Sequence, residues 1–269
     1  MKKFFALILA AMLCLTMCAC GNSNADKQTL IVGFDAEFPP FGFIGADGKY
    51  DGFDLAMARE LCKRLGWEYK ETAIDWNSKD SELSSGNINC IWNGFTANAK
   101  EKDGTERKDL VDFSSTYMLN QQCIVVKKSE LDSYKTKADL VGKTAAVEMG
   151  SAGESFAEEA VGTDGKLIGF TAQNATFMEV KTGKSDFAVV DVLLAKNICG
   201  KGDYTDIAIV EAEDLTLEAE YYAIGFKKGS DLTAKVNEAI KTLNENSKLL
   251  EIAKRYGLEN SLQVAEFNG

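Results

Sequence analysis

The segment Cys90-Ile91-Trp92-Asn93-Gly94-Phe95-Thr96 decides how the fold of this chain is interpreted. A short apolar run ends in Asn-Gly and then a hydroxyl residue, which is typical of a buried strand that opens into a turn. In open α/β sheets, small ligands bind at such strand ends. We therefore expect this turn to form the floor of a binding site for a small anionic group such as a carboxylate.

Strand and helix patterns alternate on both sides of this segment. Strands are predicted at residues 29–34, 67–72, 122–126, 167–170, 187–190 and 221–226, and helices at 55–65, 78–85, 175–182 and 193–197. Such alternation is typical of α/β layers and predicts mostly parallel sheets. The two halves have similar composition, so we expect two lobes with a ligand cleft between them.

Composition excludes several classes of function. The 269 residues carry a net charge of −11, with no basic patch, so nucleic acid is not an expected partner. The chain has no histidine, which excludes Ser-His-Asp and Cys-His catalysis and most catalytic zinc sites. No metal-binding or cofactor-binding motif is present, and we expect neither a metal nor a cofactor.

The N-terminus has the pattern of an export signal. Two lysines precede an apolar run too short to span a membrane, and the run ends in Cys18-Ala19-Cys20-Gly21. We expect residues 1–19 to be a lipoprotein signal peptide, Cys20 to carry the lipid, and residues 20–27 to be a tether. Cys18 is the weaker attachment site because bulky Met17 precedes it, and an uncleaved anchor helix is the alternative.

Four more cysteines, at positions 62, 90, 123 and 199, are widely spaced and form no CxxC motif. Three of them lie in apolar surroundings, where a free cysteine acts as a small hydrophobic residue. Buried thiols are therefore expected, although the sequence alone assigns no disulfide.

Several motifs, taken in order, resemble those of the bacterial extracellular solute-binding proteins of family 3, the polar amino-acid receptors of ABC importers. They are Gly33-Phe34-Asp35, Phe38-Pro39-Pro40-Phe41, Gly52-Phe53-Asp54-Leu55, Asn93-Gly94-Phe95-Thr96, Arg107 with Phe113-Ser114 and Tyr117, Leu140-Val141-Gly142-Lys143, Gly150-Ser151, Gly183 with Asp186 and Asp191, and Lys254-Arg255-Tyr256-Gly257-Leu258. Each motif is weak alone, but their order and spacing together are specific.

This resemblance implies a two-lobe α/β fold of the periplasmic-binding-protein type II class, with a hinge of two crossing strands. Lobe 1 would hold residues 28–119 and 216–269, and lobe 2 residues 120–215. Closure of the lobes over the ligand would be what the transporter recognises.

The resemblance also assigns partners to both charges of a buried amino acid, which would otherwise be costly to desolvate. Arg107 would bind the α-carboxylate, and Asp191 the α-ammonium. Residues 97–105 form a longer loop than in the family, so Lys100 is an alternative carboxylate partner. Asp186 is a weaker candidate than Asp191 because it precedes the strand and is expected in a turn.

Further residues complete the predicted site. The Thr96 hydroxyl and the backbone amides near Asn93, Gly94, Ser151 and Ala152 would share the ligand carboxylate. Phe38 and Trp76 would sandwich the ligand side chain, whereas Trp92 is expected in the core. Asp35 and Glu148 would face the cleft, which suits lysine, arginine or ornithine. Glu148 would equally suit hydrogen bonding to glutamine or cystine.

The resemblance implies a receptor with no catalytic residue. Its expected partners are a free L-amino acid, an ABC permease with its ATPase, and the membrane through the lipid anchor. The receptor would be a monomer in the cell envelope, on the outer face of the cytoplasmic membrane or in the periplasm. Two alternatives share the scaffold: a periplasmic dehydratase-like enzyme with Glu148 as its acid, and a chemosensory ligand-binding protein.

Overall fold

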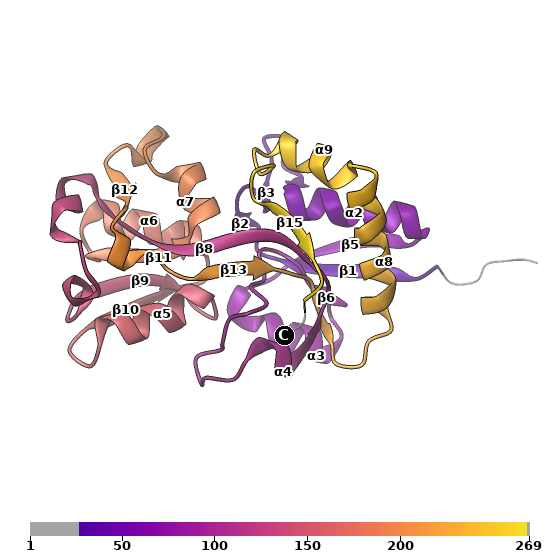
Figure 1. Ribbon diagram of the computed structural model, residues 1–269, viewed down its shortest axis with the longest axis horizontal. Coiled ribbons are helices and arrows are strands. Elements are labelled where there is room, and N and C mark those ends of the chain that lie inside the picture. Colours follow the sequence, from indigo (N-terminus) through magenta and orange to yellow (C-terminus); the bar gives the residue numbers. More distant parts are fainter. Residues whose placement is uncertain (1–26, 268–269) are drawn as a thin grey trace, which may run out of the picture.

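A computed structural model describes residues 27–267 of the chain. Two α/β assemblies lie at opposite ends of an elongated molecule and are joined in the middle by strands β8 and β13 (Figure 1). The predicted signal peptide, Cys20 and most of the predicted tether lie outside the described residues. Within residues 27–267, no helix has the length and apolarity needed to cross a membrane.

Lobe 1 is built on a five-stranded sheet of order β5-β1-β6-β14-β7. Its strands are β1 (Thr29–Phe34), β5 (Glu68–Ala73), β6 (Cys90–Ile91), β7 (Val111–Phe113) and β14 (Gly225–Lys227). Successive residues of a strand point to opposite faces. Leu30 and Val32 therefore pack with helices α2 (Phe53–Leu65), α8 (Leu232–Glu245) and α9 (Lys248–Arg255), and Ile31 packs on the side of α3 (Lys79–Ser85).

Three short strands and short helices complete this lobe. The strands β2 (Glu37–Phe38), β3 (Gly42–Ile44) and β4 (Tyr50–Asp51) form a small antiparallel sheet. A single 3-10 turn, Trp76–Ser78, precedes α3, and the four-residue helix α4 (Arg107–Leu110) follows the long loop.

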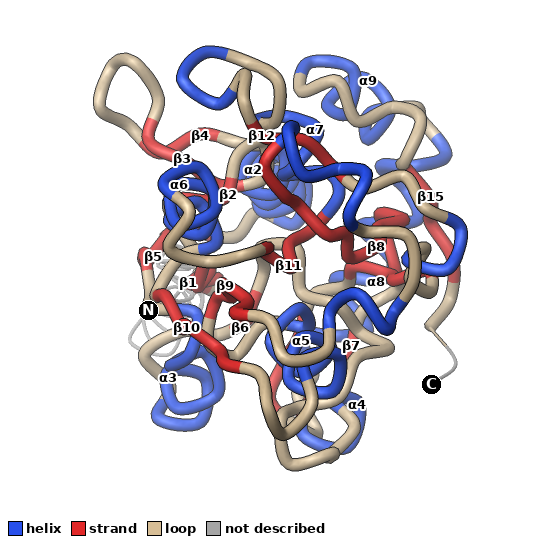
Figure 2. The backbone as a smooth tube through the Cα atoms, turned by 90° about the vertical axis from the view of Figure 1, so that its left-hand side faces the viewer, coloured by secondary structure: helices blue, strands red, loops and turns tan. Residues whose placement is uncertain are grey.

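Lobe 2 is built on a second sheet of order β10-β9-β11-β8-β12. Its strands are β8 (Thr116–Lys127), β9 (Thr144–Glu148), β10 (Lys166–Phe170), β11 (Phe187–Asp191) and β12 (Ile207–Ile209), and its helices are α5 (Ala152–Val161), α6 (Gln173–Thr182) and α7 (Val192–Ile198). Short 3-10 helices lie at Lys128–Ser133, Lys137–Leu140, Gly202–Tyr204 and Glu213–Leu215. Helix α5 packs on one face of this sheet, and α6 and α7 pack on the other (Figure 2).

The long strand β8 connects the two lobes. Its first part pairs with β13 (Ala219–Tyr222) and β15 (Leu262–Ala265), and its second part pairs with β11 and β12. Register places Glu220 of β13 opposite Asn120 of β8. β8 and β13 run side by side between the lobes (Figure 1). The lobe boundaries expected at 119/120 and 215/216 stay a prediction.

The structure corrects two expectations. The sheets are mixed rather than mostly parallel, because β8 and β14 run antiparallel to every strand with which they pair. The single strand expected at 221–226 is two strands, β13 and β14, in different sheets. Between them the amide of Ala223 donates to the Phe95 carbonyl, and the amide of Ile224 donates to Ser114 Oγ.

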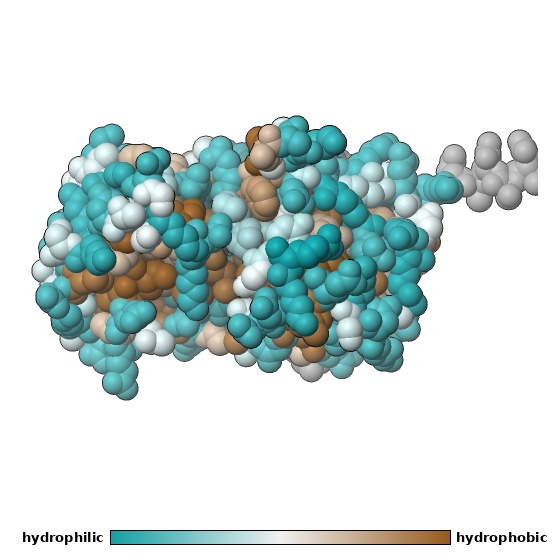
Figure 3. Space-filling view, turned by 90° about the horizontal axis from the view of Figure 1, so that it is seen from above, coloured by the Kyte–Doolittle hydropathy of each residue, from teal (hydrophilic) through white to brown (hydrophobic). Residues whose placement is uncertain are grey.

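The cysteines within the described residues are free, and Cys62, Cys90 and Cys123 are buried. Polar side chains cover most of the face in Figure 3, with apolar side chains visible between them.

Candidate functional site

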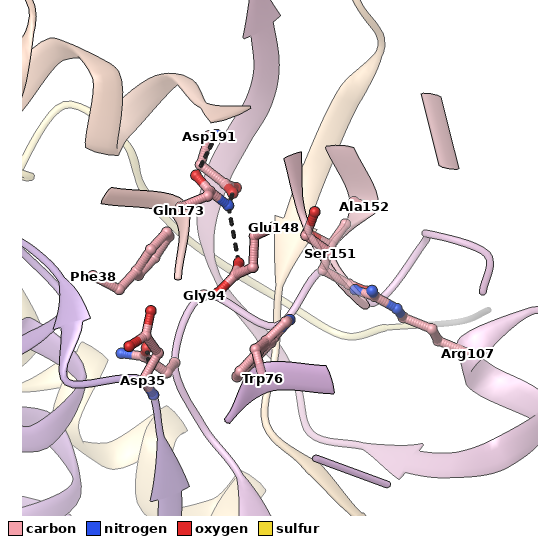
Figure 4. Close-up of a pocket in the computed structure, with 12 residues that line it drawn as sticks. Asp35, Phe38, Trp76, Gly94, Arg107, Glu148, Ser151, Ala152, Gln173 and Asp191 are labelled. Carbon is pink, nitrogen blue, oxygen red and sulfur yellow. Dashed lines mark hydrogen bonds between the residues drawn. The ribbon is translucent and has the colours of Figure 1, made fainter. Parts of the chain in front are cut away.

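All eleven residues predicted to bind the ligand line one pocket between the lobes. From lobe 1 come Asp35, Phe38, Trp76, Asn93, Gly94, Thr96 and Arg107; from lobe 2 come Glu148, Ser151, Ala152 and Asp191. Gln173, which the sequence did not single out, is the twelfth lining residue (Figure 4). The structure thus brings the predicted residues together, and their binding roles stay predictions.

Strand direction explains this convergence. Asp35 directly follows β1, and the segment from Asn93 to Thr96 follows β6, which is parallel to β1. In lobe 2, Glu148 ends β9 and Asp191 ends β11, and these strands are also parallel. Because the carboxyl ends of parallel strands lie at the same edge of a sheet, each lobe presents its polar residues on the edge that faces the cleft.

The floor turn is held by side chains from lobe 1. Asn93 Oδ1 accepts the Asp35 amide at 3.1 Å, and Asp54 Oδ2 accepts the Gly94 amide at 2.9 Å. Gly94 has φ +58°, and a Cβ there would lie 2.6 Å from the Phe38 ring, so only glycine fits. The Gly94 amide was predicted to bind the ligand carboxylate, but buried Asp54 already occupies it.

Lobe 2 presents the start of helix α5. Ser151 occupies the N-cap position, and its hydroxyl accepts the Glu154 amide at 3.2 Å. The Ser151 amide, which was expected near the ligand carboxylate, donates to the Glu148 carbonyl at 3.3 Å. Ala152 is the first residue of α5, and the amide of a first helical residue lies outside the helix's own ladder of hydrogen bonds.

Arg107 begins α4 and is only 2% exposed. Its Nε donates to Glu101 Oε1 at 2.8 Å, Nη1 donates to the Thr96 carbonyl at 3.3 Å, and Nη2 donates to the Gly150 carbonyl in lobe 2 at 3.0 Å. A guanidinium has five N–H groups, so two remain without a partner in the described part of the chain. By contrast, the side chain of Lys100 is 62% exposed and lies outside this pocket.

Asp191 is the N-cap residue of α7 but makes no capping hydrogen bond with its side chain. Its Oδ1 accepts hydrogen bonds from Tyr222 Oη and Asn120 Nδ2, both at 2.5 Å, and its Oδ2 accepts one from Gln173 Nε2 at 2.6 Å. Burial raises the pKa of Asp191, and these donors oppose that shift. Asp186 instead accepts the Thr144 amide, in agreement with the expected turn role.

Asp35 and Glu148 come from different lobes, and each has a buried carboxyl group with an oxygen that lacks a hydrogen-bond partner in the described part of the chain. Each is less than 10% exposed, and Asp35 Oδ2 and Glu148 Oε1 have no hydrogen-bond partner among residues 27–267. Burial raises the pKa of Asp35 to about 7. Burial, and then the charges of Asp35 and Asp191, raise the pKa of Glu148 well above its ordinary value. Ionisation of either carboxyl is therefore unfavourable in this structure without an added positive charge.

Two aromatic rings flank these carboxyls. Phe38 and Trp76 lie on either side of the space next to Asp35 (Figure 4) and are 4% and 5% exposed. Trp92 is fully buried in the core near Tyr117, as predicted.

The polar residues that support the pocket gave weaker signals in the sequence. Gln173 Nε2 donates to Asp191 and, at 3.4 Å, to Glu148, while its Oε1 accepts the Asp191 amide. Its position just after strand β10 was a usable signal, since it lies at the same sheet edge as Glu148. The hinge residues Asn120 and Glu220 gave no such signal, because they lie within strands.

The lobes are in close contact in this structure. A Cβ on Gly150 of lobe 2 would lie 3.1 Å from the Cα of Asn77 in lobe 1. The space left within the pocket is about 10 Å³, roughly that of one water molecule. An amino acid is several times larger, so its entry requires the lobes to separate or the lining side chains to move. Within residues 27–267, no group of Cys, Asp and Glu is arranged to hold a metal.

Comparisons with known proteins agree with this architecture. Residues 30–259 match the family described as bacterial extracellular solute-binding proteins, family 3. The arginine-binding extracellular protein ArtP of Bacillus subtilis (strain 168) is 32% identical over 206 residues, covering 73% of this chain and 75% of that protein. The L-cystine-binding protein TcyJ of Escherichia coli (strain K12) is 31% identical over 178 residues, covering 66% of this chain and 64% of that protein.

Comparison with a solved structure shows that the fold is similar as well as the sequence. An ancestral arginine-binding protein bound to arginine has a TM-score of 0.77 and 33% identity, covering 86% of this chain and 98% of that one. The predicted two-lobe fold of the periplasmic-binding-protein class is therefore confirmed. The chain belongs to the bacterial extracellular solute-binding proteins of family 3.

Proposed function

We propose that this chain captures a free L-amino acid with a cationic side chain, L-arginine first, and delivers it to the permease of an ABC importer. The observation that carries the proposal is the pair Asp35 and Glu148, each with a buried carboxylate oxygen that has no partner among the described residues. Isolated buried carboxylates are costly unless a cation compensates them. A guanidinium between them would donate charge-assisted hydrogen bonds to both carboxylates, one from each lobe.

The flanking rings suit the same ligand. Phe38 and Trp76 are placed to contact the two faces of a flat guanidinium, which stacks on aromatic rings. This arrangement favours arginine over lysine, whose ammonium is a point charge.

The charged ends of the amino acid are matched on the other side of the pocket. The two N–H groups of Arg107 without a partner, together with the first amides of α5, supply donors for the α-carboxylate. Asp191 supplies the negative charge for the α-ammonium. As a member of its family, the chain is a transport component and not an enzyme.

Calorimetric titration tests the ligand. The chain is unfolded and refolded to remove any amino acid acquired during expression, and is then titrated with arginine, lysine, ornithine, histidine, glutamine and cystine. We expect arginine to bind at least tenfold more tightly than glutamine and cystine. Tighter binding of cystine or glutamine would overturn the cationic assignment, and no binding to any of the six would overturn amino-acid capture.

The matched variants Asp35→Asn and Glu148→Gln locate the ligand side chain. Each should weaken arginine by at least tenfold while changing glutamine by less than threefold, because only arginine places a charge between the two carboxyls. An equal loss for both ligands would contradict this placement.

We also propose that Cys20 carries a lipid that anchors the protein outside the cytoplasmic membrane. Metabolic labelling with a radioactive fatty acid tests this assignment. Cys20→Ala should abolish the label and Cys18→Ala should retain it; the reverse result would move the attachment to Cys18.

A further inference from the structure

A polar chain through the hinge joins the ligand-binding residues of the two lobes. Thr96 Oγ donates to Glu220 Oε2 at 3.3 Å, and Asn120 Nδ2 donates to the same oxygen at 2.9 Å. Asn120 Nδ2 also donates to Asp191 Oδ1. Glu220, on hinge strand β13, thus stands between Thr96 of lobe 1 and Asp191 of lobe 2 without lining the pocket itself.

The donors around Glu220 fix the direction of each hydrogen bond. Its Oε2 accepts from the amides of Asn120 and Gln122, each at 2.9 Å, and from the hydroxyl of Thr96. An oxygen already accepting two amide N–H groups acts as an acceptor for the third partner as well. The hydroxyl proton of Thr96 therefore points to Glu220, and the oxygen of Thr96 keeps only lone pairs for other partners.

Because the proton of the Thr96 hydroxyl is used in the bond to Glu220, its oxygen can only accept further hydrogen bonds. It can therefore accept from an ammonium but cannot donate to a carboxylate. Resting on the proposed function, we propose that Glu220 is a positioning residue for the α-ammonium of the ligand. It takes the proton of Thr96, so that Thr96 offers lone pairs to the ammonium, and it holds the Asn120 amide that orients Asp191. Thr96 then serves the ammonium end, not the carboxylate end that the sequence predicted.

The charge around Glu220 agrees with this role. Burial, and then the charge of Asp191, raise the pKa of Glu220 to about 7, against the hydrogen bonds from Gln122 and Asn120 and the charge of Arg107. No ion pair joins Glu220 to a lysine or arginine within residues 27–267 at 4.0 Å or less. An arriving ammonium would relieve the repulsion between the two acids, so binding of the ligand's amine and ordering of Thr96 and Asp191 are coupled.

Three related ligands distinguish effects at the ammonium end of the site from effects at the carboxylate end. L-Arginine carries both end groups, agmatine lacks the α-carboxylate, and 5-guanidinopentanoate lacks the α-ammonium. Their dissociation constants are measured for the wild type and for Glu220→Gln, by displacement of arginine where binding is weak. Glu218→Gln, at an exposed position two residues earlier on the same segment, is the matched control.

We expect Glu220→Gln to weaken arginine and agmatine by at least tenfold and 5-guanidinopentanoate by less than twofold, with Glu218→Gln changing none of them. Thr96→Val should give the same pattern, and the double variant should lose less than the product of the two single effects, because both act at one hydrogen bond. Equal weakening of all three ligands, or no weakening, overturns the inference. Absence of arginine binding by the wild type overturns the proposed function instead, and the inference with it.

Discussion

Asp191 shows how one residue position can support two interpretations. It stands at the N-cap of α7, where an aspartate often accepts a backbone amide, yet its side chain makes no such hydrogen bond. Its two oxygens are instead held by Tyr222, Asn120 and Gln173. These three donors favour the ionised form of the buried carboxylate and fix its orientation at the pocket wall, which supports the proposed role in binding the α-ammonium.

Replacing this charge tests the role of Asp191. Asp191→Asn should weaken arginine binding by at least a hundredfold, because removing one member of a buried charge pair costs about 2–5 kcal/mol. Calorimetric titration measures the loss, with Asp206→Asn on the exposed surface as the control. A change of less than fivefold in Asp191→Asn would show that the ammonium binds elsewhere.

Arg107 and Lys100 are the two candidates for binding the ligand carboxylate. Arg107→Ala should weaken arginine binding by at least a hundredfold, whereas Lys100→Ala should change it by less than twofold, since Lys100 is exposed outside the pocket. Arg107→Lys should fall between wild type and Arg107→Ala, because an ammonium cannot form the two-pronged contact of a guanidinium. Titrations of the three variants decide the order, and a larger loss in Lys100→Ala would reverse the assignment.

Elements bring these residues together, and the sequence predicted most of them. Alternation and breaker residues located β1, β11 and the start of the floor turn, because apolar runs ending in polar residues are local signals. The hinge was harder to predict. Tyr222 and Phe226 lie in one continuous pattern, but tertiary hydrogen bonds to Phe95 and Ser114 divide it between two sheets. Such bonds depend on residues more than 100 positions away and leave no local trace.

The long loop before α4 provides contacts between the lobes. Lys102 lies 3.4 Å from Glu154 and 3.8 Å from Glu158 on α5, and Ser155 Oγ donates to the Lys100 carbonyl at 3.3 Å. These contacts require the lobes to be close, so they favour the closed form. Exposed ion pairs contribute about 0–1 kcal/mol each.

Removing this contact should therefore have a small and defined effect. Lys102→Ala should weaken arginine binding two- to fivefold, and high salt should reproduce that loss in the wild type but add little in the variant. Lys128→Ala, which leaves α5 untouched, is the control. Unchanged affinity together with an unchanged salt dependence would show that the loop does not influence closure.

At the scale of the whole molecule, the buried acids couple stability to pH. Burial raises the pKa of Asp54 from 3.8 to about 7, against the hydrogen bond from the Gly94 amide. Asp35 and Glu220 are raised to about 7 as well. Between pH 4 and 7, approximately, the folded chain therefore binds more protons than the unfolded chain. The stabilisation present below about pH 4 is lost as the pH rises through about 7.

Thermal unfolding tests this linkage. The ligand-free chain should melt several degrees higher at pH 5.5 than at pH 8, since each such carboxyl contributes on the order of 2 kcal/mol over this range. Asp54→Asn, a change outside the pocket, should reduce the difference between the two pH values. The increase in melting temperature caused by arginine should be larger at pH 8, where Asp35 is ionised. An equal or lower melting temperature at pH 5.5 would contradict the assignment of raised pKa values.

Sequence patterns placed the residues at strand ends along the cleft, but they did not reveal the residues that contact the pocket only through others. Asp35 and Glu148 follow apolar runs and could be recognised. Glu220 lies within the hinge, and Glu101 lies in a loop. Their roles depend on three-dimensional neighbours, Thr96 for the first and Arg107 for the second. The hydrogen bond from the Gly94 amide to Asp54 also left no signal in the sequence, because Asp54 reaches this amide from another element.

The central claim is that two lobes enclose one cationic amino acid in a single orientation. A crystal structure of the refolded chain grown with L-arginine tests it most directly. We predict the guanidinium between Asp35 and Glu148, the carboxylate on Arg107, and the ammonium on Asp191 and Thr96. Electron density for arginine in the reverse orientation, or outside this pocket, would contradict the account.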